Sequence, residues 1–389
     1  MKKNVKQLRI AYISEMRMPT EKAHGIQIMR TCESLSLAGA KVKLFYSNRK
    51  QSNHALKNLD PYKYFGVNNT FEMKSLFYID VLSLENFIKP FLKPLMFLAN
   101  LVFAFTTIIS TKSWNPDIYY TRHWLSAFVL LFAGKSVVFE LHRAGSYEFS
   151  KRALKAILLL SKIKKRFFIT CISNELKNTL IDIGVSENKI EVLPDALPTY
   201  KLKNNYSENK IFEFEVLYTG HLYEGRGVDI FIQSSKLLPD INFTIVGGNE
   251  KDRKHLIKKL NPKKNVKFVN HLSPSKIQKI QSNAKVLVLP QTDIHGQSPL
   301  KLFEYIAAKR PIIASDLTPI KEILDHKKTA LLFKSGDYHQ LANRISELVL
   351  NPELRNFLSK NASHKYKNWT WEKRSQRIIK IITNKMKKN

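Results

Sequence analysis

The segment Ser298-Pro-Leu-Lys-Leu-Phe-Glu-Tyr-Ile-Ala-Ala-Lys-Arg-Pro-Ile-Ile-Ala-Ser315 joins an amphipathic helix to a buried strand. Ser298 suits the N-cap of that helix, and Pro299 suits its first position. The unpaired amides and the positive dipole end at this start favour a phosphate. Glu304 follows in the same helix, where a carboxylate can accept hydrogen bonds from sugar hydroxyls. One helix could therefore hold the diphosphate and the ribose of a nucleotide, although a helix that only packs on a sheet explains the same segment.

Apolar runs with strand character alternate with amphipathic segments along the whole chain. This alternation is typical of βαβ units and predicts an α/β fold with parallel sheets. A polar stretch at about 196–210, rich in Pro, Asn and Lys, indicates a linker between two domains. We expect strands at 8–13, 41–46, 118–121, 136–141, 167–172, 215–218, 242–246, 266–269, 284–289, 311–314 and 330–333. We expect helices at 25–37 and, basic and amphipathic, at 369–386.

The bulk composition is that of a globular protein in a reducing compartment. The 389 residues, 44% hydrophobic and 25% charged, allow two domains with separate cores and exclude a fibre or a disordered tail. Cys32 and Cys171 lack metal-ligand spacing and argue against a disulfide framework. The first seven residues lead into a strand without a long apolar segment, so we do not expect a signal peptide.

The net charge of +32 is dispersed over the chain. Such a field attracts nucleic acid, anionic lipid or a nucleotide-activated substrate. No zinc, homeodomain or RNA-binding motif accompanies the charge, which argues against nucleic acid. The segment Lys151–Arg166 has seven cations, no acid and an apolar face, as a membrane-surface helix has. An anionic membrane surface is therefore an expected partner.

The segment Pro94–Ser110 carries no charge over 17 residues, the lower limit for spanning a bilayer. Asn100 and three Thr or Ser residues weaken that interpretation. Strand-like segments on both sides favour a buried core helix. A partly exposed apolar face that dips into a membrane, and a true membrane span, remain as alternatives.

Glycines and polar residues follow several predicted strands, where ligands bind to doubly wound sheets. Together with Ser298–Ser315, the segments Tyr218-Thr-Gly-His-Leu-Tyr-Glu-Gly-Arg-Gly-Val-Asp229 and Trp369-Thr-Trp-Glu372 resemble glycosyltransferase family 4, among the glycosyl transferases of group 1. The resemblance covers nearly the whole chain and is weakest at about 48–115.

The resemblance implies a GT-B fold, in which two facing doubly wound Rossmann-like domains are followed by a C-terminal helix that crosses back. Residues 1–197 would form an acceptor-binding domain, and residues 198–366 a domain that binds the nucleotide sugar. Residues 367–389 would form the basic helix that returns to the N-terminal domain.

Three residues are carried over from the family as catalytic. Arg226 falls where the family has a lysine on the donor diphosphate, and a guanidinium can fork onto phosphate oxygens. Glu304 matches the glutamate that binds the donor ribose. His142 matches a histidine near the donor sugar.

The other donor-binding candidates are backbone positions and additional cations. Gly25 matches the glycine that lets the first loop approach the donor, and Gly220 opens the arginine loop. His221 stands where the family often has an arginine, so the second cation on the diphosphate is in question. Lys301 could supply it, or be a surface lysine. The phosphate-binding turn matches Ser298, Pro299 and Leu300.

Gly296 departs from the family, because a sugar-binding glutamate is expected there. Asp293 or His295 could substitute for that carboxylate. The departure leaves the donor sugar open and permits a second interpretation, a catalytically weak glycosyltransferase-like subunit that acts through partner contacts.

The motifs nevertheless favour a retaining glycosyltransferase that moves a sugar from a nucleotide-diphosphate donor to a glycan or lipid-linked acceptor. By resemblance, the setting is bacterial surface polysaccharide or lipopolysaccharide assembly on the cytoplasmic face of the membrane. No Asp-x-Asp motif stands at a strand end, so we expect neither a metal nor a cofactor beside the nucleotide sugar.

Overall fold

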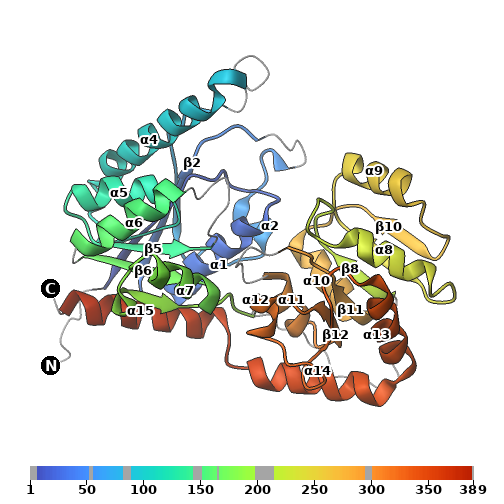
Figure 1. Ribbon diagram of the computed structural model, residues 1–389. Helices are drawn as coiled ribbons and strands as arrows, with labels where there is room; N and C mark the ends of the chain where they lie inside the picture. Colours follow the sequence, from blue (N-terminus) through green and yellow to red (C-terminus); the bar gives the residue numbers. More distant parts are fainter. Residues whose placement is uncertain are drawn as a thin grey trace. The chain divides into compact units, whose positions relative to one another are not determined.

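The structure, a computed structural model, describes residues 7–51, 56–81, 89–142, 151–163, 166–197, 214–293 and 300–387. The chain divides into two compact units (Figure 1). Unit 1 comprises Met1–Pro194 and Trp371–Asn389, and unit 2 comprises Asp195–Thr370. These boundaries lie within a few residues of the expected ones, and most of the expected linker lies outside the described residues.

Unit 1 contains a seven-stranded sheet in the order β3-β2-β1-β4-β5-β6-β7, with parallel neighbours throughout. Its strands are β1 (Arg9–Ser14), β2 (Lys41–Ser47), β3 (Glu72–Leu76), β4 (Ile118–Thr121), β5 (Val137–Leu141), β6 (Phe167–Cys171) and β7 (Ile190–Val192). The sequence patterns did not predict β3 and β7. Both are short edge strands without a continuous apolar run, because an edge strand is less buried than a central one.

Helices cover both faces of this sheet (Figure 1). They are α1 (Ala23–Leu37), α2 (Pro61–Phe65), α4 (Leu92–Thr111), α5 (Trp124–Phe132), α6 (Lys151–Ile163), α7 (Asn174–Asp182) and α15 (Trp371–Lys387). Side chains of β1 alternate between the two faces: Tyr12 joins the core beneath α1 and α15, and Ile13 joins the core beneath α4 to α7. Cys32 and Cys171 are buried free thiols.

Unit 2 contains a six-stranded parallel sheet in the order β10-β9-β8-β11-β12-β13. Its strands are β8 (Phe214–Thr219), β9 (Phe243–Val246), β10 (Val266–Val269), β11 (Ala284–Leu289), β12 (Ile312–Ser315) and β13 (Leu331–Phe333). Its helices are α8 (Val228–Lys236), α9 (Glu250–Leu260), α10 (Pro274–Ser282), α11 (Leu300–Ala307), α12 (Thr318–Lys321), α13 (Tyr338–Leu350) and α14 (Pro352–Tyr366).

Each sheet has one point where the strand order reverses. In unit 1 it lies between β1 and β4, and in unit 2 between β8 and β11. Loops that leave two such strands turn to opposite faces of the sheet, which opens a crevice at their carboxyl ends. The candidate site residues follow strands at or beside these two points.

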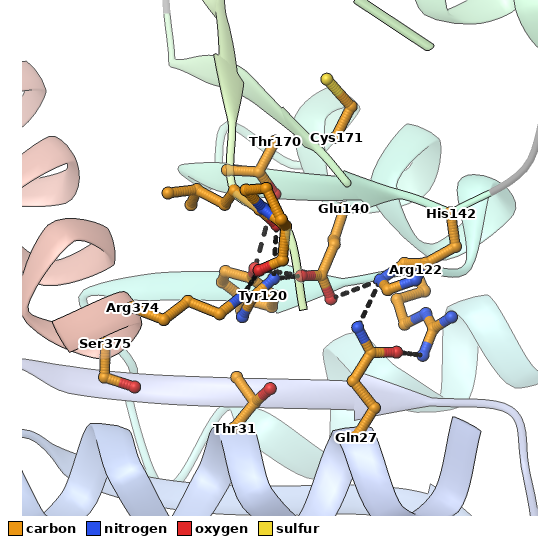
Figure 2. A network of polar contacts seen from close by, with 12 residues as sticks. Gln27, Thr31, Tyr120, Arg122, Glu140, His142, Thr170, Cys171, Arg374 and Ser375 are labelled. Atoms are coloured by element: carbon orange, nitrogen blue, oxygen red, sulfur yellow. Dashed lines mark hydrogen bonds and ion pairs between the residues drawn. The ribbon is translucent and has the colours of Figure 1, made fainter. Parts of the chain in front are cut away.

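The last helix, α15, is anchored in unit 1 by a buried ion pair. Arg374 donates to the carboxylate of Glu140 on β5, and both side chains are almost fully buried (Figure 2). The Arg374 Nε also donates to the carbonyl of Pro194 at 3.0 Å. Ser34 on α1 and Ser375 hydrogen-bond at 2.5 Å. Residues at the end of the chain therefore complete the first unit.

We predict that Glu140→Gln destabilises unit 1 by about 3–5 kcal/mol, because the substitution leaves a buried guanidinium without its counter-charge. Glu191→Gln is the matched control. Glu191 pairs with Arg377 of the same helix at 2.9 Å, but both side chains are about half exposed. Its loss should cost about 0–1 kcal/mol. Differential scanning calorimetry, which resolves units that unfold separately, measures both. Equal losses in the two variants would contradict the prediction.

Candidate functional site

In unit 2, the loop that follows β8 is held against the loop that follows β11. Gly227 has a left-handed backbone (φ 68°), and a Cβ there would lie 1.6 Å from the carbonyl oxygen of Pro290. The amide of Thr292 donates to the carbonyl of Gly225 at 3.1 Å. Gly227 is therefore required by close backbone contact across the reversal point, and Gly225 is favoured by its left-handed backbone (φ 82°).

Arg226 and His221 in this loop share one aromatic neighbour. The guanidinium of Arg226 lies over the Tyr223 ring at 4.8 Å and donates to its hydroxyl at 2.6 Å. The His221 ring stacks on the same tyrosine at 5.2 Å. The sequence predictions included both basic residues but missed Tyr223, whose position between them in the loop was the available signal.

Glu304, the predicted ribose ligand on α11, is held by side chains from two helices. The amide of Gln281, on α10, donates to its Oε2 at 3.1 Å and to the hydroxyl of Thr219 at 2.9 Å. Thr219 is the last residue of β8, and Gln281 is buried. Lys301 also reaches the Glu304 Oε2 at 2.5 Å. Glu304 is thereby linked to the strand that carries the arginine loop, through a glutamine that no sequence motif indicated.

The predicted phosphate-binding turn lies mostly outside the described residues. Leu300 belongs to α11 as far as that helix is described. Ser298, Pro299, Gly296 and His295 lie outside the described residues. Lys301 forms an ion pair with Glu304 and is only partly exposed.

Close packing of neighbouring side chains accounts for two of the predicted glycines. Gly220 has little room for a side chain, because a Cβ there would lie 2.8 Å from the Tyr218 hydroxyl. Gly25 lies inside α1, and a Cβ there would lie 2.6 Å from Thr20 and 2.7 Å from Phe65. Packing in unit 1 is thus a sufficient reason for that glycine.

In unit 1, His142 follows β5 and belongs to the polar network around Glu140 (Figure 2). The His142 Nε2 lies 3.1 Å from the Glu140 Oε2 and 3.2 Å from the amide nitrogen of Gln27. Arg122, which follows β4, donates to the Gln27 Oε1 at 2.8 Å and so turns the amide nitrogen of Gln27 toward the histidine. The other carboxylate oxygen of Glu140 accepts from the Tyr120 hydroxyl at 2.9 Å.

The charge on Glu140 determines how His142 is protonated. Burial alone would raise the pKa of the Glu140 carboxyl, but Arg374 and His142 outweigh it and hold that pKa well below its usual range. The Glu140 carboxylate and the Gln27 amide both lie within hydrogen-bond distance of the His142 Nε2. The carboxylate is the stronger partner, because hydrogen bonds to ionised groups are about twice as strong as neutral ones. We therefore assign the proton to Nε2, which leaves the lone pair on Nδ1.

His142 is neutral at pH 7. Burial, assisted by the guanidinium of Arg122 and opposed by Glu140, lowers its pKa to about 4. His24 on α1 behaves alike: burial first, then Arg122, lowers its pKa to about 3. The sequence predictions named His142 but missed Glu140, Gln27, Arg122 and Arg374, which come together only in the folded unit.

We predict that unit 1 loses stability as the pH falls from about 6.5 to about 4, by roughly 1–3 kcal/mol from His142. In this window the unfolded chain binds a proton that folded His142 excludes, so acid favours unfolding. His142→Gln keeps a donor for Glu140 but removes the titration, and should flatten the curve. The exposed His255, on α9, provides the control His255→Gln. Calorimetric Tm values across the pH range would contradict the prediction if His142→Gln matched wild type.

Two sequence relatives and one solved structure place this geometry among known proteins. The chain is 23% identical to the capsular polysaccharide biosynthesis glycosyltransferase CapM of Staphylococcus aureus, over 56% of this chain and 57% of that protein. It is 26% identical to the alpha-galactosylglucosyldiacylglycerol synthase of Streptococcus pneumoniae, over 53% of each chain. The matched regions thus span little more than half the length of these relatives.

The fold is shared with the crystal structure of Anabaena HepE in complex with UDP-glucose. The TM-score is 0.73 at 16% identity, over 97% of this chain and all of that one. Residues 204–365 match the family described as glycosyl transferases group 1, and this range holds Gly220, Arg226 and Glu304. The chain therefore has a GT-B fold, and residues 204–365 of its C-terminal unit are similar to the glycosyl transferases of group 1.

Proposed function

We propose that this protein transfers a sugar from a nucleotide-diphosphate donor to a glycan or lipid-linked acceptor, with retention of the anomeric configuration. The observation that carries the proposal is the link from Glu304 through Gln281 to Thr219. It holds the candidate ribose ligand and the loop of Arg226 at one reversal point of one sheet. Nucleotides bind doubly wound sheets at such points.

In the proposed donor site, Arg226 binds the diphosphate and Glu304 accepts hydrogen bonds from the ribose hydroxyls. His221 and Lys301 are the further donor-binding candidates of this site. Lys301 fixes the orientation of the Glu304 carboxylate, to which it is paired at 2.5 Å. A preorganised cation acts best where charge develops during the reaction, here on the departing diphosphate.

The proposed reaction is departure of the nucleotide diphosphate through an oxocarbenium-like transition state, with the acceptor hydroxyl attacking from the same face. The bond from the anomeric carbon to the diphosphate breaks, and the bond to the acceptor oxygen forms. The acceptor proton leaves with the diphosphate or passes to solvent. Arg226 and the start of α11 take the place of a metal, and no cofactor besides the donor is required.

Neutral His142 is proposed to serve the donor sugar as an acceptor of hydrogen bonds. With its proton held on Nε2 by Glu140, the ring offers Nδ1 to a sugar hydroxyl. A neutral ring also adds no positive charge beside a developing oxocarbenium ion. Glu140 then acts as the positioning residue for His142.

The acceptor is proposed from chemistry and from the relatives. The names of two relatives refer to a capsular polysaccharide and to a diacylglycerol glycolipid. A chain of net charge +32 suits a substrate presented on an anionic surface. We therefore place the protein in the assembly of bacterial surface polysaccharide or lipopolysaccharide, at the cytoplasmic face of the membrane.

We predict that Arg226→Ala and Glu304→Ala each weaken donor binding roughly tenfold to hundredfold, because each removes a hydrogen bond to a charged or polar donor group. A thermal-shift screen with UDP-, GDP-, ADP- and CMP-sugars first identifies the donor. Titration and turnover then compare the two variants with Arg253→Ala and Glu353→Ala, which remove the same side chains from α9 and α14. Turnover should persist in EDTA.

Two outcomes would count against the enzyme. Binding of no nucleotide sugar, with Arg226→Ala and Glu304→Ala equal to wild type in cells, would favour the glycosyltransferase-like subunit. Donor binding without turnover would assign the loss to Gly296, and a Gly296→Glu variant that gains turnover would support that assignment.

A further inference from the structure

One face of α4, with the N-cap residue Phe91 before it, is apolar and exposed or half-exposed along the helix. Positions on this face recur with alternating spacings of four and three residues, as one side of a helix requires. We call this face the apolar stripe; its members are Phe91, Leu95, Leu98, Val102, Phe105 and Ile109. Leu98 is 51% exposed, Phe105 54% and Ile109 76%. The favoured expectation of a buried core helix is therefore wrong for this face.

The opposite face of α4 fixes the orientation of the helix. Phe103 is fully buried in the core of unit 1, and its ring lies 5.8 Å from that of Tyr78. The Tyr78 hydroxyl donates to Asn100 at 3.1 Å, and Thr111 hydrogen-bonds to Tyr119 at 2.9 Å. Packing and hydrogen bonds on the opposite face of α4 therefore keep the apolar stripe directed away from the core of unit 1. Among the described residues, α4 alone is long and apolar enough to cross a bilayer. Only 22% of its most apolar 18-residue stretch is buried, so most of the helix is not covered by protein.

Lysines lie near both ends of the helix that carries the stripe, and this helix contains no acid. Lys93 and Lys112 are exposed near the two ends of α4, and residues 89–112 contain no Asp or Glu. On α6, Lys155 and Lys162 are exposed on either side of Leu159, which is 50% exposed. In Figure 1, α4, α5 and α6 lie in one layer on the same side of the sheet, and α5 packs against both of its neighbours.

We propose that the apolar stripe of α4, with the lysines of α4 and α6, seats unit 1 on an anionic phospholipid bilayer. The helix would lie in the interface, with its aromatic and aliphatic side chains in the acyl boundary and its lysines at the headgroups. The inference deepens the proposed function, because it supplies the surface that a lipid-linked acceptor requires.

A second copy of the chain is a poorer occupant of this face. Two stripes packed together in either direction would bring the lysines of one helix near the lysines of the other. No acid in residues 89–112 could compensate that repulsion. A membrane rich in anionic lipid removes the same repulsion by charge complementarity.

Flotation of the full chain with vesicles tests the proposal. Wild type should bind vesicles that mix phosphatidylglycerol with phosphatidylcholine, and bind pure phosphatidylcholine at least tenfold more weakly. Phe105→Glu/Ile109→Glu should lose at least tenfold in partition to the mixed vesicles. Lys93→Gln/Lys112→Gln should lose about tenfold or more, at about 1 kcal/mol per lysine. The matched control, Leu350→Glu/Phe357→Glu, places the same charges at exposed apolar positions of unit 2 and should bind like wild type.

Three results would overturn the proposal. These are a wild type that does not float with the mixed vesicles, a stripe variant that binds as wild type does, and a wild-type dimer that the stripe variant converts to a monomer without any vesicle binding. Donor binding measured on the same proteins separates this proposal from the proposed function. Vesicle binding without donor binding would support the membrane-binding surface and contradict the proposed reaction. Donor binding without vesicle binding would support the proposed reaction and contradict the membrane-binding surface.

Discussion

The buried ion pair between Glu140 and Arg374 is the interaction on which unit 1 depends. Burying two charges costs several kcal/mol per ion, and the cost is recovered only with close pairing and additional hydrogen bonds. Here the carboxylate also accepts from Tyr120, and the guanidinium also donates to the backbone of Pro194. Since neither residue tolerates burial without the other, the last helix is part of the first unit.

The same ion pair reaches the candidate chemistry through one further hydrogen bond. The carboxylate that binds Arg374 through one oxygen faces the His142 Nε2 through the other. The contact with Glu140 thereby determines the tautomer of the histidine, and burial keeps the ring neutral by lowering its pKa to about 4. In unit 2 a neutral amide orients the site residue instead. Gln281 donates to Glu304 and to Thr219, and so connects Glu304 to the end of β8. The two units use the same sheet topology and different chemistry to orient one polar side chain each.

The exposed apolar face of α4 in unit 1 has a different cause, namely the number of elements that pack against the helix. A helix at the edge of a layer can bury only part of its circumference against the sheet and the next helix. The apolar composition of α4 suggested burial because composition does not record how many faces find a partner. The packing of Phe103 inward leaves Phe105 outward, and that difference turns a candidate core helix into a candidate membrane contact.

The sequence alone determined the α/β class, the eleven most apolar strands and the motif residues, because these depend on local periodicity and on short spacings. It therefore placed Arg226 and Glu304 correctly on a loop after β8 and on helix α11. The edge strands β3 and β7 were not predicted, because their partial burial leaves little apolar pattern in the sequence. The partners of the site residues could not be read from the chain, since Glu140 and Arg374 are 234 positions apart and Gln281 is 23 positions from Glu304. Only the tertiary structure brings such residues together, and burial then decides which of them are charged.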